Sequence, residues 1–180
     1  MEFELFYEKF QKIAEKETRL ITIIERDVNI PKGRGDFAFI EAFCNDKDCD
    51  CRRVMFNVTQ LNDKYPVKHY ATIAYGWEDI NFYKKWSLGM PEDIIKMFKG
   101  PIDDPTLRQT EYSPIFLEMF KRSLLPDKDY LERVKRHYFL FKLKLGGKAI
   151  KELSESIDKY SFCPCNSGKK FKYCCYKKIK

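Results

Sequence analysis

The spacing of hydrophobic positions separates a strand-rich first half of the chain from a helical second half. Apolar residues recur at helical spacing over about residues 2–18, which predicts a leading helix. A break at 31–35, rich in Gly with one Pro, separates the first predicted strand from a predicted hairpin. The four strands that the pattern predicts are 19–25, 36–44, 53–61 and 68–75.

After Gly76 the pattern takes the period of helices. Ser113 followed by Pro114 is typical of a helix start, with the serine as N-cap and the proline in the first turn. The helices that we predict are near 78–87, 91–98, 113–124, 128–145 and 148–158. The sequence contains no internal repeat and no low-complexity segment.

The predicted helix at 128–145 carries an apolar stripe and much positive charge. The stripe that we expect to face the core is Tyr130, Leu131, Val134, Tyr138, Phe141 and Leu145. Lys128, Lys135 and Lys142 repeat every seven residues with Arg136 beside them, and this arrangement fits either a phosphate-contacting ridge for RNA or a solvated helix face. His137 lies outside any catalytic motif, so we expect a partly exposed structural histidine.

Four cysteines near the end of the chain have the spacing of a metal site. They follow the pattern C-x-C-x8-C-C and are Cys163, Cys165, Cys174 and Cys175. Adjacent cysteines, and a proline between the first pair, make disulfide geometry awkward. Four thiolates around one ion are typical of structural zinc sites, which are closed and perform no chemistry. We therefore predict a zinc-held module, although the sequence does not decide between zinc and iron.

The run from Cys163 to Cys175 closely resembles the SEC-C motif, the zinc-binding knuckle of the SecA translocation ATPase and of many other bacterial proteins. The usual form of the motif is C-P-C-G-S-G-K-K-[YF]-K-x-C-[CH], and this chain departs from it only at Asn166, where Gly is usual. Asn tolerates a left-handed turn, so the departure is mild. The resemblance covers about residues 160–177, and it implies that all four cysteines ligate the metal. The chain has no phosphate-binding G-x-x-x-x-G-K-[ST] run, so it is not a SecA motor.

Charge is distributed unevenly along the chain. Residues 121–180 carry 17 Lys and Arg against 6 Asp and Glu, whereas residues 1–120 carry 17 against 21. A basic C-terminal third indicates an anionic partner at that end. The knuckle of SecA is associated with the SecB chaperone and with ribosomes, so the resemblance implies a protein or ribosomal surface. The residues that we expect to contact the partner are Lys169, Lys170, Phe171 and Lys172, with Phe171 and Tyr173 either packing under the metal or stacking on the partner.

A second cysteine cluster lies between the two strands of the predicted hairpin. Cys44, Cys49 and Cys51 provide three thiols, and a metal site there needs a fourth ligand. His69 is a candidate, but in a simple meander it lies about 20 Å from the hairpin tip. The other candidates are Asp46, Asp48, Asp50, Glu78 and Asp79. The alternative is a polar turn with semi-buried thiols. A calcium loop is excluded because its sixth position is Cys rather than Gly and its twelfth is Asn rather than Glu.

These patterns predict an α+β fold: an antiparallel sheet of about four strands with a leading helix, a helical C-terminal segment and a small zinc knuckle. We expect a sheet domain with the Cys-rich hairpin at 1–90, a helical segment packed on it at 91–159, and the knuckle at 160–180. The function predicted is a non-enzymatic, metal-binding adaptor. The alternative is an enzyme or ligand-binding protein with a metal site at the N-terminal cluster, and a third reading is an RNA binder. The start of the chain lacks a signal-peptide layout and no run is long enough to cross a membrane, so we expect a cytoplasmic protein without membrane insertion.

Overall fold

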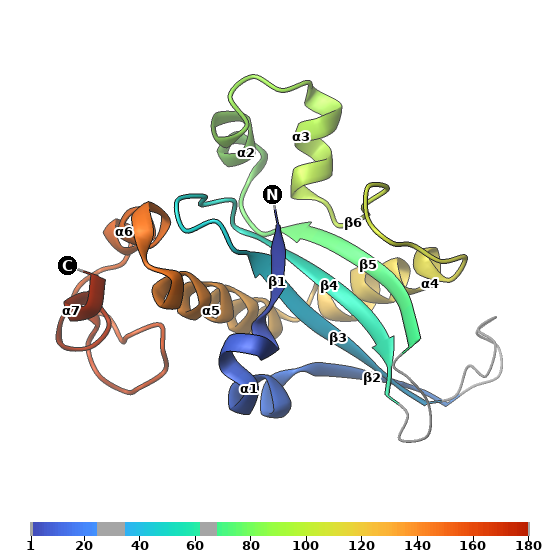
Figure 1. The fold of residues 1–180 in the computed structure, drawn as a ribbon, viewed down its shortest axis with the longest axis horizontal. Coiled ribbons are helices and arrows are strands. Elements are labelled where there is room, and N and C mark those ends of the chain that lie inside the picture. Colours follow the sequence, from blue (N-terminus) through green and yellow to red (C-terminus); the bar gives the residue numbers. More distant parts are fainter. Residues whose placement is uncertain (1, 25–34, 62–67, 180) are drawn as a thin grey trace.

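An antiparallel sheet forms the centre of the computed structural model, which describes residues 2–24, 35–61 and 68–179 (Figure 1). The strands within these ranges are β1 (Phe3–Leu5), β2 (Arg19–Ile23), β3 (Gly35–Cys44), β4 (Arg53–Gln60), β5 (Lys68–Gly76) and β6 (Ile102–Asp103). Their order is β1-β3-β4-β5-β6, and β2 pairs with the same strand as β1. Strands β3, β4 and β5 form a meander in which every pairing is antiparallel.

The helices follow the sheet for the most part. They are α1 (Phe6–Glu17), α2 (Ile80–Trp86), α3 (Glu92–Lys99), α4 (Ser113–Met119), α5 (Lys128–Leu145), α6 (Gly147–Glu155) and α7 (Tyr176–Ile179). A π-helical turn, η1 (Phe120–Leu124), extends α4, and a 3-10 turn, η2 (Phe171–Tyr173), precedes α7. Figure 1 shows α5 crossing one face of the sheet and leading to α6 and the C-terminal tail at one end of the molecule.

The main core lies between the sheet and the helices α4 and α5. Phe39, Phe43 and Phe56 on the sheet are fully buried, and Phe120 and Tyr138 approach them from the helical layer. Burial of aromatic side chains of this size is the main favourable contribution to folding of such a layer. The smaller cluster of Ala42, Met55 and Ala74 forms a separate core.

The α+β class is confirmed, and the four predicted strands correspond to β2 to β5. The sheet has six strands within the described residues instead of about four. The prediction missed β1 and β6 because strands of three and two residues are too short to give a hydrophobic pattern. The predicted helix at 2–18 was wrong at its start, since Phe3–Leu5 pairs with β3 before α1 begins at Phe6. Residues 31–34 of the predicted break, and position 25 of the first strand, lie outside the described residues.

Ser113 does not have the predicted capping role. Its hydroxyl accepts a hydrogen bond from the Thr110 amide at 2.9 Å and donates to the Tyr70 carbonyl at 3.2 Å. Tyr112 occupies the N-cap position without a side-chain cap, while the proline lies in the first turn as predicted. The serine therefore fixes the start of α4 to β5 instead of capping the helix.

The lysines of α5 differ from both readings of the sequence, the phosphate-contacting ridge and the solvated face. Lys128 is exposed and Lys135 is half-buried, but Lys142 is completely buried. The apolar stripe is largely confirmed, with Leu131 and Leu145 half-buried and its other members buried. The three lysines therefore do not form one solvated line, because the C-terminal part of α5 is covered by the loop between β3 and β4.

Candidate metal centres

The four cysteines of the tail bring their sulfur atoms together. The Sγ atoms of Cys163, Cys165, Cys174 and Cys175 all lie within 4.8 Å of one another. The Sγ of Cys165 is 3.3 Å from that of Cys163 and 3.5 Å from that of Cys174. Sulfur atoms about 2.3 Å from a tetrahedral zinc ion lie about 3.8 Å apart, so this spacing suits one closed metal site.

Short-range backbone hydrogen bonds shape the segment that presents these thiols. The Cys163 amide donates to the Lys169 carbonyl at 2.8 Å, and the Asn166 amide donates to the Cys163 carbonyl at 3.0 Å. Asn166 has a φ of +60°, the left-handed conformation expected at this position of the motif. The turn folds the first cysteine pair towards Cys174, which begins the last turn of the chain.

Hydrogen bonds among the thiols distribute their acidity unevenly. Burial raises the pKa of Cys165, but hydrogen bonds with Ser167, Cys163 and Cys174 outweigh that effect and lower it to about 6. Burial raises the pKa of Cys175, and hydrogen bonds with Cys163 and Cys165 raise it further. One thiolate is therefore favoured before any ion binds, and a bound cation would hold all the thiols in this form.

Phe171 anchors the tail to the rest of the protein. Its side chain is fully buried, and its ring centroid lies 6.1 Å from that of Phe139 on α5 and 5.5 Å from that of Tyr176. This burial favours the reading in which Phe171 packs inside the protein over the reading in which it stacks on a partner. Lys169 and Lys170 are exposed and Lys172 is half-buried, so these residues remain on the surface.

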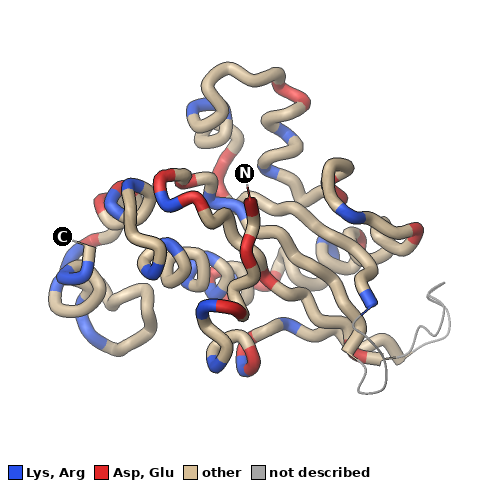
Figure 2. Tube along the Cα trace, in the orientation of Figure 1, with Lys and Arg blue, Asp and Glu red and all other residues tan. Residues whose placement is uncertain are grey.

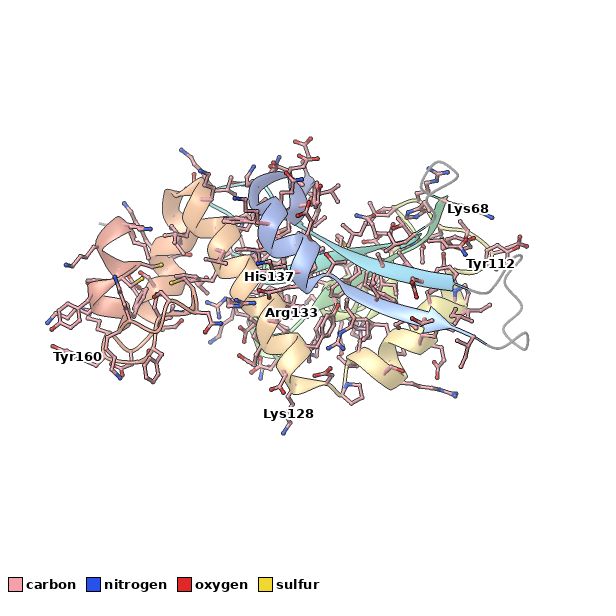
Figure 3. The ribbon with its side chains drawn as sticks, turned by 90° about the horizontal axis from the view of Figure 1, so that it is seen from below. Lys68, Tyr112, Lys128, Arg133, His137 and Tyr160 are labelled. Atoms are coloured by element: carbon pink, nitrogen blue, oxygen red, sulfur yellow. The ribbon has the colours of Figure 1, made fainter. Side chains whose placement is uncertain are left out.

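Three exposed aromatic rings lie among the lysines of the tail. Tyr160, Phe162 and Tyr173 are 57%, 69% and 57% exposed. The Lys170 ammonium lies 4.3 Å from the Phe162 ring centroid, and that of Lys172 lies 4.9 Å from the Tyr160 ring. Figure 2 shows the basic residues of the tail, and Figure 3 shows Tyr160 projecting from the end of the molecule. We call this surface, formed by Tyr160, Phe162, Lys169, Lys170, Lys172 and Tyr173, the tail face.

The second cluster is built by the central strands of the sheet. Cys44 is the last residue of β3, and Cys49 and Cys51 lie in the loop that leads to β4. Their three Sγ atoms lie within 4.8 Å of one another, with Cys44 and Cys51 fully buried and Cys49 half-buried. Hydrogen bonds from Cys49 and Cys51 lower the pKa of Cys44, while hydrogen bonds with Cys44 and Cys49 raise that of Cys51.

Two buried cations flank this cluster. The Lys142 ammonium is fully buried and donates to the carbonyls of Cys44 and Asp46, both at 2.8 Å. Arg53 is 3% exposed, its guanidinium stacks on Phe98 at 4.8 Å, and its Nε has no hydrogen-bond partner. Burial lowers the pKa of Arg53, whereas the nearby Cys51 acts in the opposite direction. The burial of Lys142 was not expected from the sequence, because its heptad spacing suggested a place on the surface of the helix.

The loop that carries the second cluster also holds the start of α6. The Lys148 amide donates to the Asp48 carboxylate at 2.8 Å, and the Ala149 amide donates to the Lys47 carbonyl at 3.1 Å. Gly147 has a φ of +81°, and a Cβ there would lie 2.6 Å from the Lys47 carbonyl oxygen. This contact requires glycine and links the three-thiol loop to the helix that precedes the tail.

None of the predicted fourth ligands joins the three thiols in the described structure. His69 pairs with Thr59 at the far end of β4, and its Nε2 lies 3.0 Å from the Arg108 carbonyl oxygen. The meander therefore keeps the histidine away, as the sequence argument expected. The carboxylates engage other groups. Asp46 accepts from the Asp48 amide, Asp48 from the Lys148 amide, Asp50 from Arg52 and Tyr138, Glu78 from Arg52, and Asp79 from the Phe82 amide.

Sequence reasoning missed the buried histidine network. His137 is 1% exposed, and its Nδ1 and Nε2 lie 2.7 Å from Glu41 and 3.1 Å from Glu17. The ring stacks on Phe6 with a centroid distance of 4.3 Å. Figure 3 shows His137 on α5 next to α1. The expectation of a partly exposed histidine was wrong, because its two carboxylate partners come from β3 and α1 and were not visible in the local pattern.

A cavity of about 450 Å³ lies between the body and the tail. Its lining includes Arg52, Trp77 and Tyr138 from the body, together with Ile157 and Pro164 from the region of the knuckle. Its wall is mixed in polarity, and neither cysteine cluster lines it. In the described part of the chain no helix has the length and apolar character needed to cross a membrane.

Comparison with known proteins gives one curated relative. The chain is 28% identical over 122 residues to UPF0225 protein plu2503 of Photorhabdus laumondii subsp. laumondii, and the match covers 61% of this chain and 74% of the relative. No protein-family model matches the sequence. No solved structure matches either. The relative's name states no ligand or activity, so the candidate metal centres are the strongest functional evidence for this chain.

Proposed function

We propose that the protein is a metal-binding adaptor in which a C-terminal zinc knuckle presents the tail face to an anionic partner. The observation that carries the proposal is the closed group of four thiols beneath exposed lysines and aromatic rings. In this proposal Cys163, Cys165, Cys174 and Cys175 bind zinc, with iron as the alternative ion, and no chemistry takes place there. The resemblance of this segment to the SEC-C knuckle supports the same assignment.

The body of the protein then acts as a platform for the knuckle. We propose a sheet part at 1–90, a helical part at 91–159 and the knuckle at 160–180. The buried Phe171 fixes the knuckle against α5, while the residues of the tail face remain exposed or half-buried. Reduced thiols in two groups fit a cytoplasmic location, where disulfides are rare.

The chemistry of the tail face favours a partner that is both acidic and able to pack on aromatic rings. Lysine ammonium groups provide charge complementarity, which steers association and weakens as ionic strength rises. Exposed tyrosine and phenylalanine rings provide apolar contact area. We propose a protein partner, such as a chaperone or a ribosomal surface, with RNA as the alternative outcome of the test.

The test is cosedimentation with ribosomes and capture from cytosol by the metal-loaded full chain at low and high salt. Replacing Lys169, Lys170 and Lys172 by Gln should weaken association and reduce its salt dependence, because each removed cation removes one screened contact. A control variant replaces Lys12, Lys84 and Lys85, which are exposed on the body, and should bind like the wild type. Treatment with ribonuclease separates a protein surface from RNA. An affinity that changes neither with salt concentration nor in the triple Gln variant would contradict the proposal.

A ligand-binding or enzymatic role of the N-terminal cluster is the second candidate. The specific observation in its favour is the pair of buried cations, Lys142 and Arg53, beside three thiols that lack a fourth protein ligand in the described structure. Buried cations beside thiols favour the thiolate form, and three thiolates leave one position of a tetrahedral ion for a further ligand.

A further inference from the structure

We propose that Cys44, Cys49 and Cys51 bind a divalent metal ion as three thiolates and leave its fourth position to an anion from solution. This inference goes beyond the adaptor function, and it does not depend on metal binding by the tail. It predicts that one chain carries two metal sites of different kinds, one closed and one open.

The first argument is the number and placement of the donors. The three Sγ atoms already lie within 4.8 Å of one another, and small shifts bring them to the spacing of about 3.8 Å that tetrahedral zinc thiolates require. No His, Asp or Glu of the described chain adds a ligand atom to this group. Three protein ligands with one position left over is the arrangement of metal sites that accept water or substrate.

The second argument is the charge around the sulfur atoms. Lys142 is fully buried with two carbonyl partners on the cluster loop, and none of the ion pairs within the described residues includes it. A buried cation without a counter-charge is costly. Three thiolates and one divalent ion carry a single negative charge, which neutralises the Lys142 ammonium.

The third argument concerns the charge of the remaining ligand. Arg53 adds a second buried cation that interacts with Cys51 and Cys49, and its Nε is unpartnered. Asp104 also acts on Arg53 but forms no ion pair with it among the described residues. Both buried cations beside the thiols favour negative charge at the ion, so an anionic fourth ligand such as hydroxide, azide or an external thiolate is favoured over a neutral one.

The binding step is balanced without any change of oxidation state. Each cysteine that carries a proton releases it to solvent as its sulfur–metal bond forms, and water completes the coordination. An incoming anion then displaces this water. Cys49 is half-buried, whereas the other two cysteines are fully buried, so the anion reaches the ion from the side of Cys49.

Cobalt(II) binding to the full chain with Cys174→Ser and Cys175→Ser tests the inference. These changes disable the tail site, so the cobalt spectrum reports the N-terminal cluster alone and the test is independent of the adaptor proposal. We expect one cobalt per chain with thiolate charge-transfer absorption, and ligand-field bands that shift when azide is added. Adding Cys49→Ser, the least buried ligand, should remove most of this absorption. Absence of thiolate-bound cobalt, or ligand-field bands that do not shift when azide is added, would overturn the proposal.

Lys142→Met in the same background tests the role of the buried cation, with Lys144→Met as control because Lys144 is exposed on the same helix. We expect the dissociation constant for cobalt to rise about 10- to 100-fold in the first variant and to stay unchanged in the second. Circular dichroism and thermal unfolding establish that each variant is folded. Equal cobalt affinity in two folded variants would overturn the charge-balance argument.

Discussion

The two cysteine clusters differ in what holds their sulfur atoms in place. The tail cluster lies in a segment whose regular structure consists of a three-residue 3-10 turn and a four-residue helix. The N-terminal cluster begins at the end of a ten-residue central strand and is covered by α5 and α6. A segment too small to bury its own core depends on its ion for structure, whereas a loop held by a sheet does not. The tail site is therefore expected to fold only when its metal binds, whereas the N-terminal site is expected to be folded before its metal binds.

The clusters also differ in the position of their cations. The lysines of the tail face stand at the surface, where water screens their charge and partners can reach them. Lys142 and Arg53 are buried beside the N-terminal thiols and cannot contact a macromolecule. This difference is the basis of the two proposals, association with a partner at the tail and ligand binding at the N-terminal cluster.

The largest expected effect is that of Cys174→Ser on the tail. A neutral hydroxyl is a poor zinc ligand, so the tail should lose both its metal and its order. Tail amides should lose their protection from hydrogen exchange, while the thermal midpoint of the body stays close to that of the wild type. The control is Asn166→Gly, which places the usual residue of the motif at a positive φ and should retain the metal. A tail that remains protected in the serine variant would contradict the closed site.

A smaller effect is expected from Phe171→Ala, which removes the buried ring between α5 and the tail. We expect a loss of about 3–5 kcal/mol in the docking of the tail. Tyr173→Ala is the matched control, since this residue lies in the same 3-10 turn but is 57% exposed. Limited proteolysis near residues 155–162 measures the release of the tail. Equal cleavage of the two variants would contradict the anchoring role.

Arg53→Ala should destabilise the body by about 3 kcal/mol, because it removes a buried side chain that packs on the Phe98 ring and leaves Cys51 without its neighbouring cation. Its neighbour Arg52 is partly exposed and pairs with Asp50 and Glu78 at 3.0 Å. Arg52→Ala should therefore cost about 1 kcal/mol, the upper range for such pairs. Urea unfolding of both variants provides the comparison, and the reverse order of stabilities would refute the buried charge network.

Local patterns in the sequence were sufficient to predict the three strands of the meander and the four-cysteine group. The central strands are buried along most of their length and are visible in the sequence as short, largely apolar runs between turn residues. The spacing of the tail cysteines depends on nearby residues only. Short edge strands such as β1 escaped prediction, because Phe3 and Phe6 fit a helical period as well as a strand that pairs with β3. The stabilising contact in that case is distant in sequence.

The environment of the second cluster was hidden for a similar reason. The partners of Lys142 are backbone carbonyls about a hundred residues earlier in the chain, and those of His137 are carboxylates on two other elements. Heptad spacing suggested a solvated lysine line because periodicity on one helix does not say which loop covers its end. Similarly, the place of Phe171 was decided by Phe139 on α5 rather than by the motif.

Hydrogen exchange of the full chain before and after complete metal removal tests the contrast between the clusters most directly. The account predicts that amides in residues 162–178 lose protection when the metal is removed, while those of β3 and β4 remain protected by the sheet. Metal removal should change exchange in the loop at 45–52 only slightly, because strands and helices hold it on both sides. Unchanged protection of the tail, or loss of protection in β3 and β4 together with the tail, would contradict the account.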